Sequence, residues 1–272
     1  MGPLLLGHAM IFINQQVDKI IVSGLEEGTV TAMGYAAVLS NFISTFIGSI
    51  CGVLFTYITQ KIAKHEDKEA AEFSISSVGQ LVTLLLPISI LTVLNSKDIV
   101  TIVFGRGKFN SEAIGSCSLA LMGYGFMFVP YAIREVFSRF QYAYSDSKRP
   151  TINSTVAIIF NTLFSIILSR FMGVLGVTLA TSLSVVICAI LNIMSSHQKN
   201  HNITVRAYIN YIPHWLIGCC LCIILSIVGQ KHLSNIAPIG RFAIIAASGL
   251  LTYYIINLPL LKPLFYRIKD RR

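Results

Sequence analysis

The longest stretch without a charged residue, from Thr29 to Gln60, constrains the fold of this chain more than any other feature. About 20 predominantly apolar residues in a helix are enough to cross a bilayer, so this stretch is long enough to span one. The composition agrees, because 54% of the residues are hydrophobic and only 12% are charged, against about 25% charged residues in soluble domains. The sequence therefore predicts an integral membrane protein.

Further charge-free runs, separated by charged or turn-rich loops, predict an all-α polytopic protein with about eight transmembrane helices. The segment SRFMGVLG joins the fifth run to the sixth, which predicts a tight antiparallel hairpin. The outer loop after the third run is expected to hold a short interfacial segment. The expected spans are Leu4–Leu25, Thr29–Leu54, Ser74–Leu94, Ile114–Ile133, Thr151–Ser169, Gly173–Ile193, Ile212–Val228 and Phe242–Leu258.

The positions of the basic residues predict the orientation of these spans. With the amino terminus inside the cell, most of the 21 Lys and Arg residues fall in cytoplasmic loops or in the carboxy-terminal tail, which is the usual bias of membrane proteins. Both termini are therefore expected in the cytoplasm. Topology and contact with anionic membrane lipids explain the net charge of +9, so no nucleic-acid partner is expected. No basic segment precedes the first apolar run, so no removable signal peptide is expected.

Five polar side chains interrupt the first expected span. An ionisable residue at the centre of a membrane helix costs about 2.5–3.5 kcal/mol, so these residues are expected to face a protein interior or a water-filled cavity. At about 100° per residue, Asn14 and Asp18 share one face of the helix, with Gln15 and Lys19 beside them. The first span is thus predicted to form the polar wall of a shielded space. The five residues are Asn14, Gln15, Gln16, Asp18 and Lys19.

The segment between Ile133 and Pro150 has a different pattern. Glu135 and Arg139 stand four positions apart with the acid first, which favours a helical ion pair, and Arg134 precedes them. Together with the apolar side chains between them, these residues predict an amphipathic helix on the cytoplasmic surface. Such a helix either fixes the loop between two spans or contacts lipid head groups.

Nothing in the sequence predicts an enzyme. The six cysteines all fall within apolar runs and lack the paired spacing of zinc ligands or of a disulfide framework. Adjacent acidic residues occur only in a tight turn, at Glu26 and Glu27, and in a charged loop, at Glu66 and Asp67. There is no phosphate-binding loop and no nucleophile with its base.

Three ordered motifs carry a resemblance to a known family. They are INQQVDKIIVSGLEEGTVTAMGYAAVL at Ile13–Leu39, REVFSRFQYAYSDSKRP at Arg134–Pro150, and a third at Asn161–Ser184 that contains MGVLGVTLATSLS. Together they resemble the carboxy-terminal lobe of the MurJ/MviN lipid II flippases, members of the multidrug, oligosaccharidyl-lipid and polysaccharide exporter superfamily.

The resemblance implies the domain organisation. Family members are V-shaped transporters of fourteen helices, in which two six-helix lobes surround a central cavity and two extra helices follow the second lobe. Residues 1–195 would be the second lobe, and residues 196–272 the two additional helices with a basic tail. Alternating access needs two bundles that rock about a shared site. A separate first lobe or a second copy of the chain is therefore an expected partner, unless the chain is a truncated, non-transporting membrane protein.

The resemblance also implies a sodium site. Its ligands would be the Asp18 carboxylate, the Asn161 amide oxygen, the Ser165 and Thr181 hydroxyls and the Val177 carbonyl, and hard oxygen atoms of this kind suit a small cation. Ser165 departs from the family pattern, since a second carboxylate there would bind the cation more strongly. Alternatively, Asp18 pairs with Lys19 or with a neighbouring helix, and the amide and hydroxyl groups join helices to one another. Apart from Na⁺ as a coupling ion, no cofactor is expected.

The expected substrate is a lipid-linked diphosphate. Family members often carry a basic residue soon after the second-span Tyr-Ala pair, which is absent from Tyr35–Leu39, so Lys19 is the remaining cation for phosphate, with Asn14 and Gln15 beside it. The predicted function is translocation of undecaprenyl-diphosphate-linked lipid II across the bacterial inner membrane for cell-wall synthesis. The membrane potential or a cation gradient would drive it. The alternatives are a polysaccharide or drug exporter of the same superfamily and a membrane scaffold that transports nothing.

Overall fold

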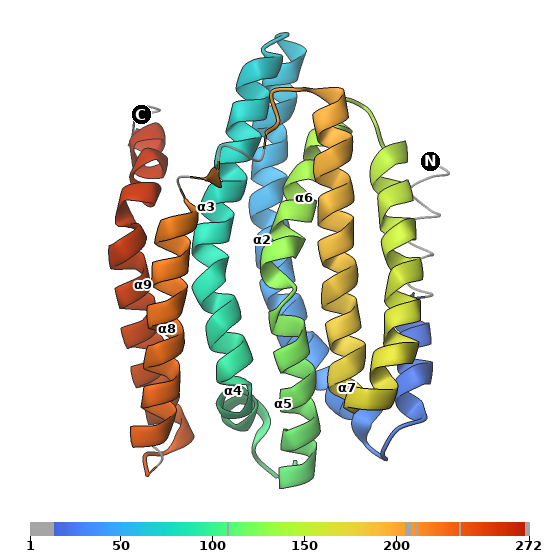
Figure 1. The fold of residues 1–272 in the computed structure, drawn as a ribbon, viewed down its shortest axis with the longest axis vertical. Helices are drawn as coiled ribbons and strands as arrows, with labels where there is room; N and C mark the ends of the chain where they lie inside the picture. Colours follow the sequence, from blue (N-terminus) through green and yellow to red (C-terminus); the bar gives the residue numbers. More distant parts are fainter. Residues whose placement is uncertain (1–13, 108, 205–207, 210, 234, 270–272) are drawn as a thin grey trace.

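The chain forms one bundle of long helices (Figure 1). The computed structural model describes residues 14–107, 109–204, 208–209, 211–233 and 235–269, and all regular structure in these ranges is helical. A helix covers residues 14–23. The others are α2 (Thr29–Ala63), α3 (Asp67–Leu94), α4 (Ser96–Phe104), α5 (Ser111–Gly125), α6 (Phe128–Ala143), α7 (Lys148–Lys199), α8 (Ile212–His232) and α9 (Pro238–Lys269).

The helix α7 is a hairpin rather than one straight rod. Gly173 has φ 56° and ψ −134°, a left-handed conformation that breaks the helix near its middle. In Figure 1 the first half of α7 runs down one side of the bundle, and the second half runs back up beside the first. At Gly176 an added Cβ would collide with the Leu168 carbonyl oxygen, so the turn also needs a residue without a side chain there. The predicted hairpin of the fifth and sixth spans is confirmed.

The fourth expected span is two helices, α5 and α6, which meet at an angle of 43°. The prediction ended this span at Ile133 and placed Arg134, Glu135 and Arg139 on a separate surface helix. That boundary is wrong, because α6 continues without interruption from Phe128 to Ala143. Its apolar side packs against α2, α3 and α7. The fully buried side chains on that side include Ala132, Val136, Phe137 and Phe140.

The helices account for the predicted spans. Within the described residues, α2, α3, α7, α8 and α9 are long and apolar enough to cross a membrane, and the bent α5–α6 pair makes a further span. The hairpin α7 supplies two spans because it reverses at Gly173. Residues 14–23 belong to the first expected span, whose start at Leu4 lies outside the described residues. The short helix α4 takes the place of the predicted interfacial segment.

The loops predicted to be cytoplasmic and the loops predicted to be external lie at opposite ends of the bundle. In Figure 1 the loop between α2 and α3 and the end of α7 lie at the upper end, whereas α4 and the Gly173 turn lie at the lower end. We call these the upper and lower ends from here on. The loops predicted to be cytoplasmic share the upper end, which is consistent with the predicted alternation of the spans.

The helices α8 and α9 pack against each other and against α3. Polar contacts fix them there: the Trp215 indole donates to Thr83 Oγ1 (2.8 Å), and the Tyr254 hydroxyl donates to the Leu84 carbonyl (3.1 Å). At the lower end, Arg241 of α9 forms a bidentate pair with Asp98 of α4, with 2.8 Å between Nε and Oδ2. These contacts attach the last two helices to the rest of the bundle.

Candidate functional site

A cluster of polar side chains joins the first helix to the first half of α7. Asp18 is 8% exposed, and its carboxylate accepts hydrogen bonds from Asn161 Nδ2 (3.1 Å to Oδ2, 3.3 Å to Oδ1) and from Ser165 Oγ (3.0 Å). Asn161 Nδ2 also donates to Asn14 Oδ1 (3.0 Å). Asn14 and Asp18 are one turn apart on one helix, as are Asn161 and Ser165 on the other, so the four side chains meet in two layers.

Packing around this cluster explains its position. Val22, one turn beyond Asp18, and Val177, in the second half of α7, belong to the same buried apolar cluster. Since Val22 is fully buried, the Asp18 side of the helix must face the bundle. A buried carboxylate needs donors to compensate for lost solvation, and Asn161 and Ser165 provide them.

The cluster has one polar atom without a partner. Asn161 Oδ1 is buried and accepts no hydrogen bond, because the amide turns its nitrogen towards Asp18. An orphaned amide oxygen beside a carboxylate is a donor set that a hard cation can use. The fit is incomplete, since Thr181 Oγ1 donates to the Val177 carbonyl (3.2 Å) and both expected ligands are thereby bonded to each other. The sodium site therefore stays a prediction, resting on Asp18, Asn161 and Ser165.

Lys19 and Gln15 lie beside the Asp18 face of the first helix, about 100° and about 60° around the helix axis from Asp18. Both side chains are exposed. Asp18 bonds to α7 and not to Lys19, and no salt bridge of Lys19 exists among the described residues. A cation inside a predicted membrane span and without a carboxylate partner there is free to meet a ligand or another polypeptide.

Arg134, Glu135 and Arg139 form a partly buried charged group on α6, with side chains that are 24%, 14% and 34% exposed. Glu135 accepts from Arg134 (2.6 Å) and lies 3.6 Å from Arg139, and the Arg134 guanidinium stacks 4.7 Å from the Tyr131 ring centroid. Arg139 Nε is buried without a hydrogen-bond partner. Two guanidinium groups share one carboxylate, so the group carries net positive charge. The signal for this placement was the apolar spacing of three and four that continues through Val129, Ala132 and Val136.

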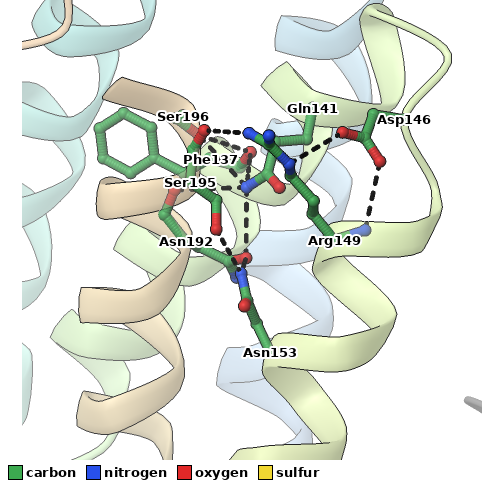
Figure 2. A network of polar contacts seen from close by, with 8 residues as sticks. All are labelled: Phe137, Gln141, Asp146, Arg149, Asn153, Asn192, Ser195 and Ser196. Carbon is green, nitrogen blue, oxygen red and sulfur yellow. Dashed lines mark hydrogen bonds and ion pairs between the residues drawn. The ribbon is translucent and has the colours of Figure 1, made fainter. Parts of the chain in front are cut away.

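Sequence reasoning missed a second polar network, near the upper end (Figure 2). Asn192 Oδ1 accepts from Gln141 Nε2 (3.2 Å) and Asn153 Nδ2 (2.8 Å), and Asn192 Nδ2 donates to Ser138 Oγ (3.0 Å). Gln141 Nε2 also donates to Ser196 Oγ (3.2 Å). The network links α6 to both halves of α7. The available signal was a set of amide side chains inside apolar runs, which favour partners on neighbouring helices.

These features define a multi-pass α-helical membrane protein with the bundle fold of a transporter lobe. The structure of a lipid II flippase MurJ in an inward closed conformation matches 97% of this chain and 53% of that chain, with a TM-score of 0.78 and 20% identity. An outward-facing multidrug resistance transporter of the MATE family and MOP superfamily matches with a TM-score of 0.63 and 19% identity, over 97% of this chain and 67% of that chain. Both likenesses concern the fold.

The chain belongs to the lipid II flippase MurJ family, whose model matches residues 1–246. A probable lipid II flippase MurJ of Vibrio cholerae is 24% identical over 188 residues, covering 68% of this chain and 35% of the relative. One from Helicobacter pylori J99 is 28% identical over 183 residues, covering 67% of this chain and 40% of the relative. The chain thus spans between about a third and a half of the length of the curated relatives it matches.

Proposed function

We propose that this chain forms one lobe of a lipid II flippase, which carries the undecaprenyl-diphosphate-linked precursor of peptidoglycan across the bacterial inner membrane. The observation that carries the proposal is the family match over residues 1–246. The polar first helix supports it, because a membrane helix with a buried Asp18 and an exposed Lys19 on neighbouring faces needs protein or water against both. The activity is transport, and no bond of the substrate is made or broken.

A second bundle completes the transporter. The chain covers 53% of the MurJ structure that it resembles, and alternating access requires two bundles around one site. Either a first lobe from elsewhere or a second copy of this chain closes the passage against the side of the first helix that carries Gln15 and Lys19. Both termini lie in the cytoplasm, which the shared upper end of the predicted cytoplasmic loops supports.

Lys19 and Gln15 are the substrate contacts of this lobe. The Lys19 ammonium donates to diphosphate oxygens, and the Gln15 amide donates to neighbouring oxygens of the head group. Asn14 has a different role, since its side-chain oxygen already accepts from Asn161 (3.0 Å) and so helps to position the Asp18 cluster.

The sodium site of this lobe is built around Asp18. The Asp18 carboxylate, Asn161 Oδ1 and Ser165 Oγ hold the ion, and Val177 and Thr181 join when Thr181 releases the Val177 carbonyl. The ion supplies a positive charge that compensates the buried carboxylate. Asp18 and Asn161 come from separate helices, so binding also fixes the first helix against α7.

Rescue of cells depleted of their resident lipid II flippase tests the proposal. The chain is expressed alone and with the first lobe of a MurJ relative, and growth and lipid II translocation are measured. Lys19→Gln is expected to reduce rescue at least about tenfold, the loss of one charge-assisted contact, while Lys64→Gln, an exposed lysine at the upper end, leaves it unchanged. Absence of rescue in every combination would contradict the proposal and favour a scaffold. Translocation of other cargo only would favour a polysaccharide or drug exporter.

A further inference from the structure

A cleft at the lower end of the bundle is lined by aromatic rings and one arginine. It lies between α2, α4 and α5 and has a volume of about 580 Å³, which falls within the range of small-molecule sites. Its lining includes Thr31 and Tyr35 of α2, Phe104 at the end of α4, and Arg106 and Phe109 of the following loop. None of these residues belongs to the Asp18 cluster or to the network of Figure 2.

The three rings form one group. The Tyr35 centroid lies 4.9 Å from that of Phe104 and 5.4 Å from that of Phe109, the second pair edge to face. Tyr35 is 41% exposed. A half-exposed aromatic wall offers an apolar surface with a hydroxyl at its edge, on which the C–H face of a sugar ring can pack.

The charge of the cleft is positive. Arg106 is exposed and forms no salt bridge among the described residues. No carboxylate is among the lining residues of this cleft; Glu27 and Glu112 adjoin it along the chain with exposed side chains but do not line it. An unpaired guanidinium beside an apolar wall suits a phosphate group, which it can bind through two parallel hydrogen bonds.

The position of Arg106 supports a functional role. The lower end carries the loops predicted to lie outside the cell, where Lys and Arg are disfavoured. Tyr35 belongs to the second-span motif of the family resemblance, and an exposed face of α2 continues from it through Val38 and Phe42. The cleft therefore opens at the outer end of a face that the fold leaves uncovered.

From this combination we infer that the cleft binds the glycosyl diphosphate head group of the lipid-linked substrate at the outer end of its path. Arg106 holds a phosphate, and Tyr35 and Phe109 hold the first sugar. The inference rests on the proposed function and deepens it, because it adds a release-side subsite to the contacts of Lys19.

Photo-crosslinking tests the inference on the full chain in lipid nanodiscs. The probe is a farnesyl diphosphate that carries an N-acetylhexosamine with a diazirine on the sugar. Cross-links are expected in peptides containing residues 28–35 and 103–113. Arg106→Gln is expected to weaken labelling there at least about tenfold. Lys97→Gln, a matched substitution of an exposed residue on α4, is expected to leave labelling unchanged.

Two further comparisons separate sugar phosphate from other ligands. Unlabelled compounds compete with the probe for the cleft. Phe109→Leu is expected to weaken competition by the sugar-bearing farnesyl diphosphate but not by farnesyl diphosphate alone. Phosphatidylglycerol is expected to compete poorly, because it has a phosphate but no sugar ring. Equal competition by phosphatidylglycerol, or labelling of the cleft that ignores Arg106→Gln, would overturn the inference.

The experiments distinguish an error in the inferred binding site from an error in the proposed function. Labelling of the cleft that depends on Arg106, in a chain that rescues no flippase-depleted cell, would leave the binding site standing and contradict transport. Full rescue by the Arg106→Gln variant with unchanged labelling would contradict binding of the head group in the cleft, and the proposal of transport would still hold.

Discussion

The coupling between Asp18 and Asn161 is a measurable energy. Asn161 donates to both oxygens of a carboxylate that is 8% exposed. A hydrogen bond to a charged group contributes about 1.5–3 kcal/mol, whereas double-mutant cycles in a membrane protein average about 0.6 and reach about 1.7 kcal/mol. Because Asp18 is ionisable and nearly buried, we expect a coupling of about 1.5–2 kcal/mol, at the upper end of the membrane range.

A double-mutant cycle with Asp18→Asn and Asn161→Leu measures this coupling. The free energy of unfolding is obtained by denaturant titration in detergent, followed by the helical circular dichroism signal. The control cycle pairs Lys19→Gln with Asn161→Leu and is expected to be additive within about 0.3–0.5 kcal/mol, since these side chains share no contact. Additivity in the first cycle, or strong coupling between Lys19 and Asn161 in the control cycle, would refute the arrangement of the Asp18 cluster.

Three further predictions follow from other parts of the bundle. Asn192→Leu removes the side-chain hydrogen bonds of Asn192 to Gln141, Asn153 and Ser138 and should lower the unfolding free energy by about 2 kcal/mol, whereas Met194→Leu, at an exposed position of α7, should leave it unchanged. Gly176→Val should destabilise the α7 hairpin by at least about 1–3 kcal/mol in the same titration, because its Cβ would collide with backbone. Burial, with a hydrogen bond to the Asp67 carboxylate, raises the pKa of Tyr144 to about 12. The Tyr144 hydroxyl should therefore contribute its full stabilisation below pH 10 and lose it as the pH rises to 12, while phenolate absorbance follows the ionisation.

Much of the fold could be predicted because bilayer thickness sets the length of apolar runs. The starts of α2 and α8 and the end of α3 agree with the predicted boundaries. The bend between α5 and α6 has a signal in the sequence that the prediction of a single span did not use: α5 ends at Gly125, and Pro130 lies in the first turn of α6, where it cannot donate to the carbonyl of Phe126. Arg134 and Arg139 were placed on the surface because their charge suggested water. The structure instead places them on α6 and partly buried, where both pair with Glu135 and Arg134 stacks on Tyr131.

The site was predictable only in part. Helical spacing placed Asn14 and Asp18 on one face, and the family resemblance supplied Asn161 and Ser165, which the structure brings to Asp18. The bond from Thr181 to the Val177 carbonyl is the common bond of a helical threonine to the carbonyl four residues earlier, and the predicted sodium site did not take it into account. The network around Asn192 was missed because its members come from three helix segments far apart in the sequence.

Cysteine accessibility most directly tests the central claim that the first helix lines a passage between two bundles. Gln15→Cys and Lys19→Cys are placed singly in a chain whose two cysteines that are not buried, Cys219 and Cys220, are replaced by alanine, and the chain is expressed with a first lobe. Both positions should react with a water-soluble maleimide, and Met194→Cys, on an exposed apolar face of α7 with Val186 and Ile190 that we expect to face lipid, should not. Protection of positions 15 and 19 from the water-soluble reagent, with reaction only with a lipid-soluble one, would contradict the claim.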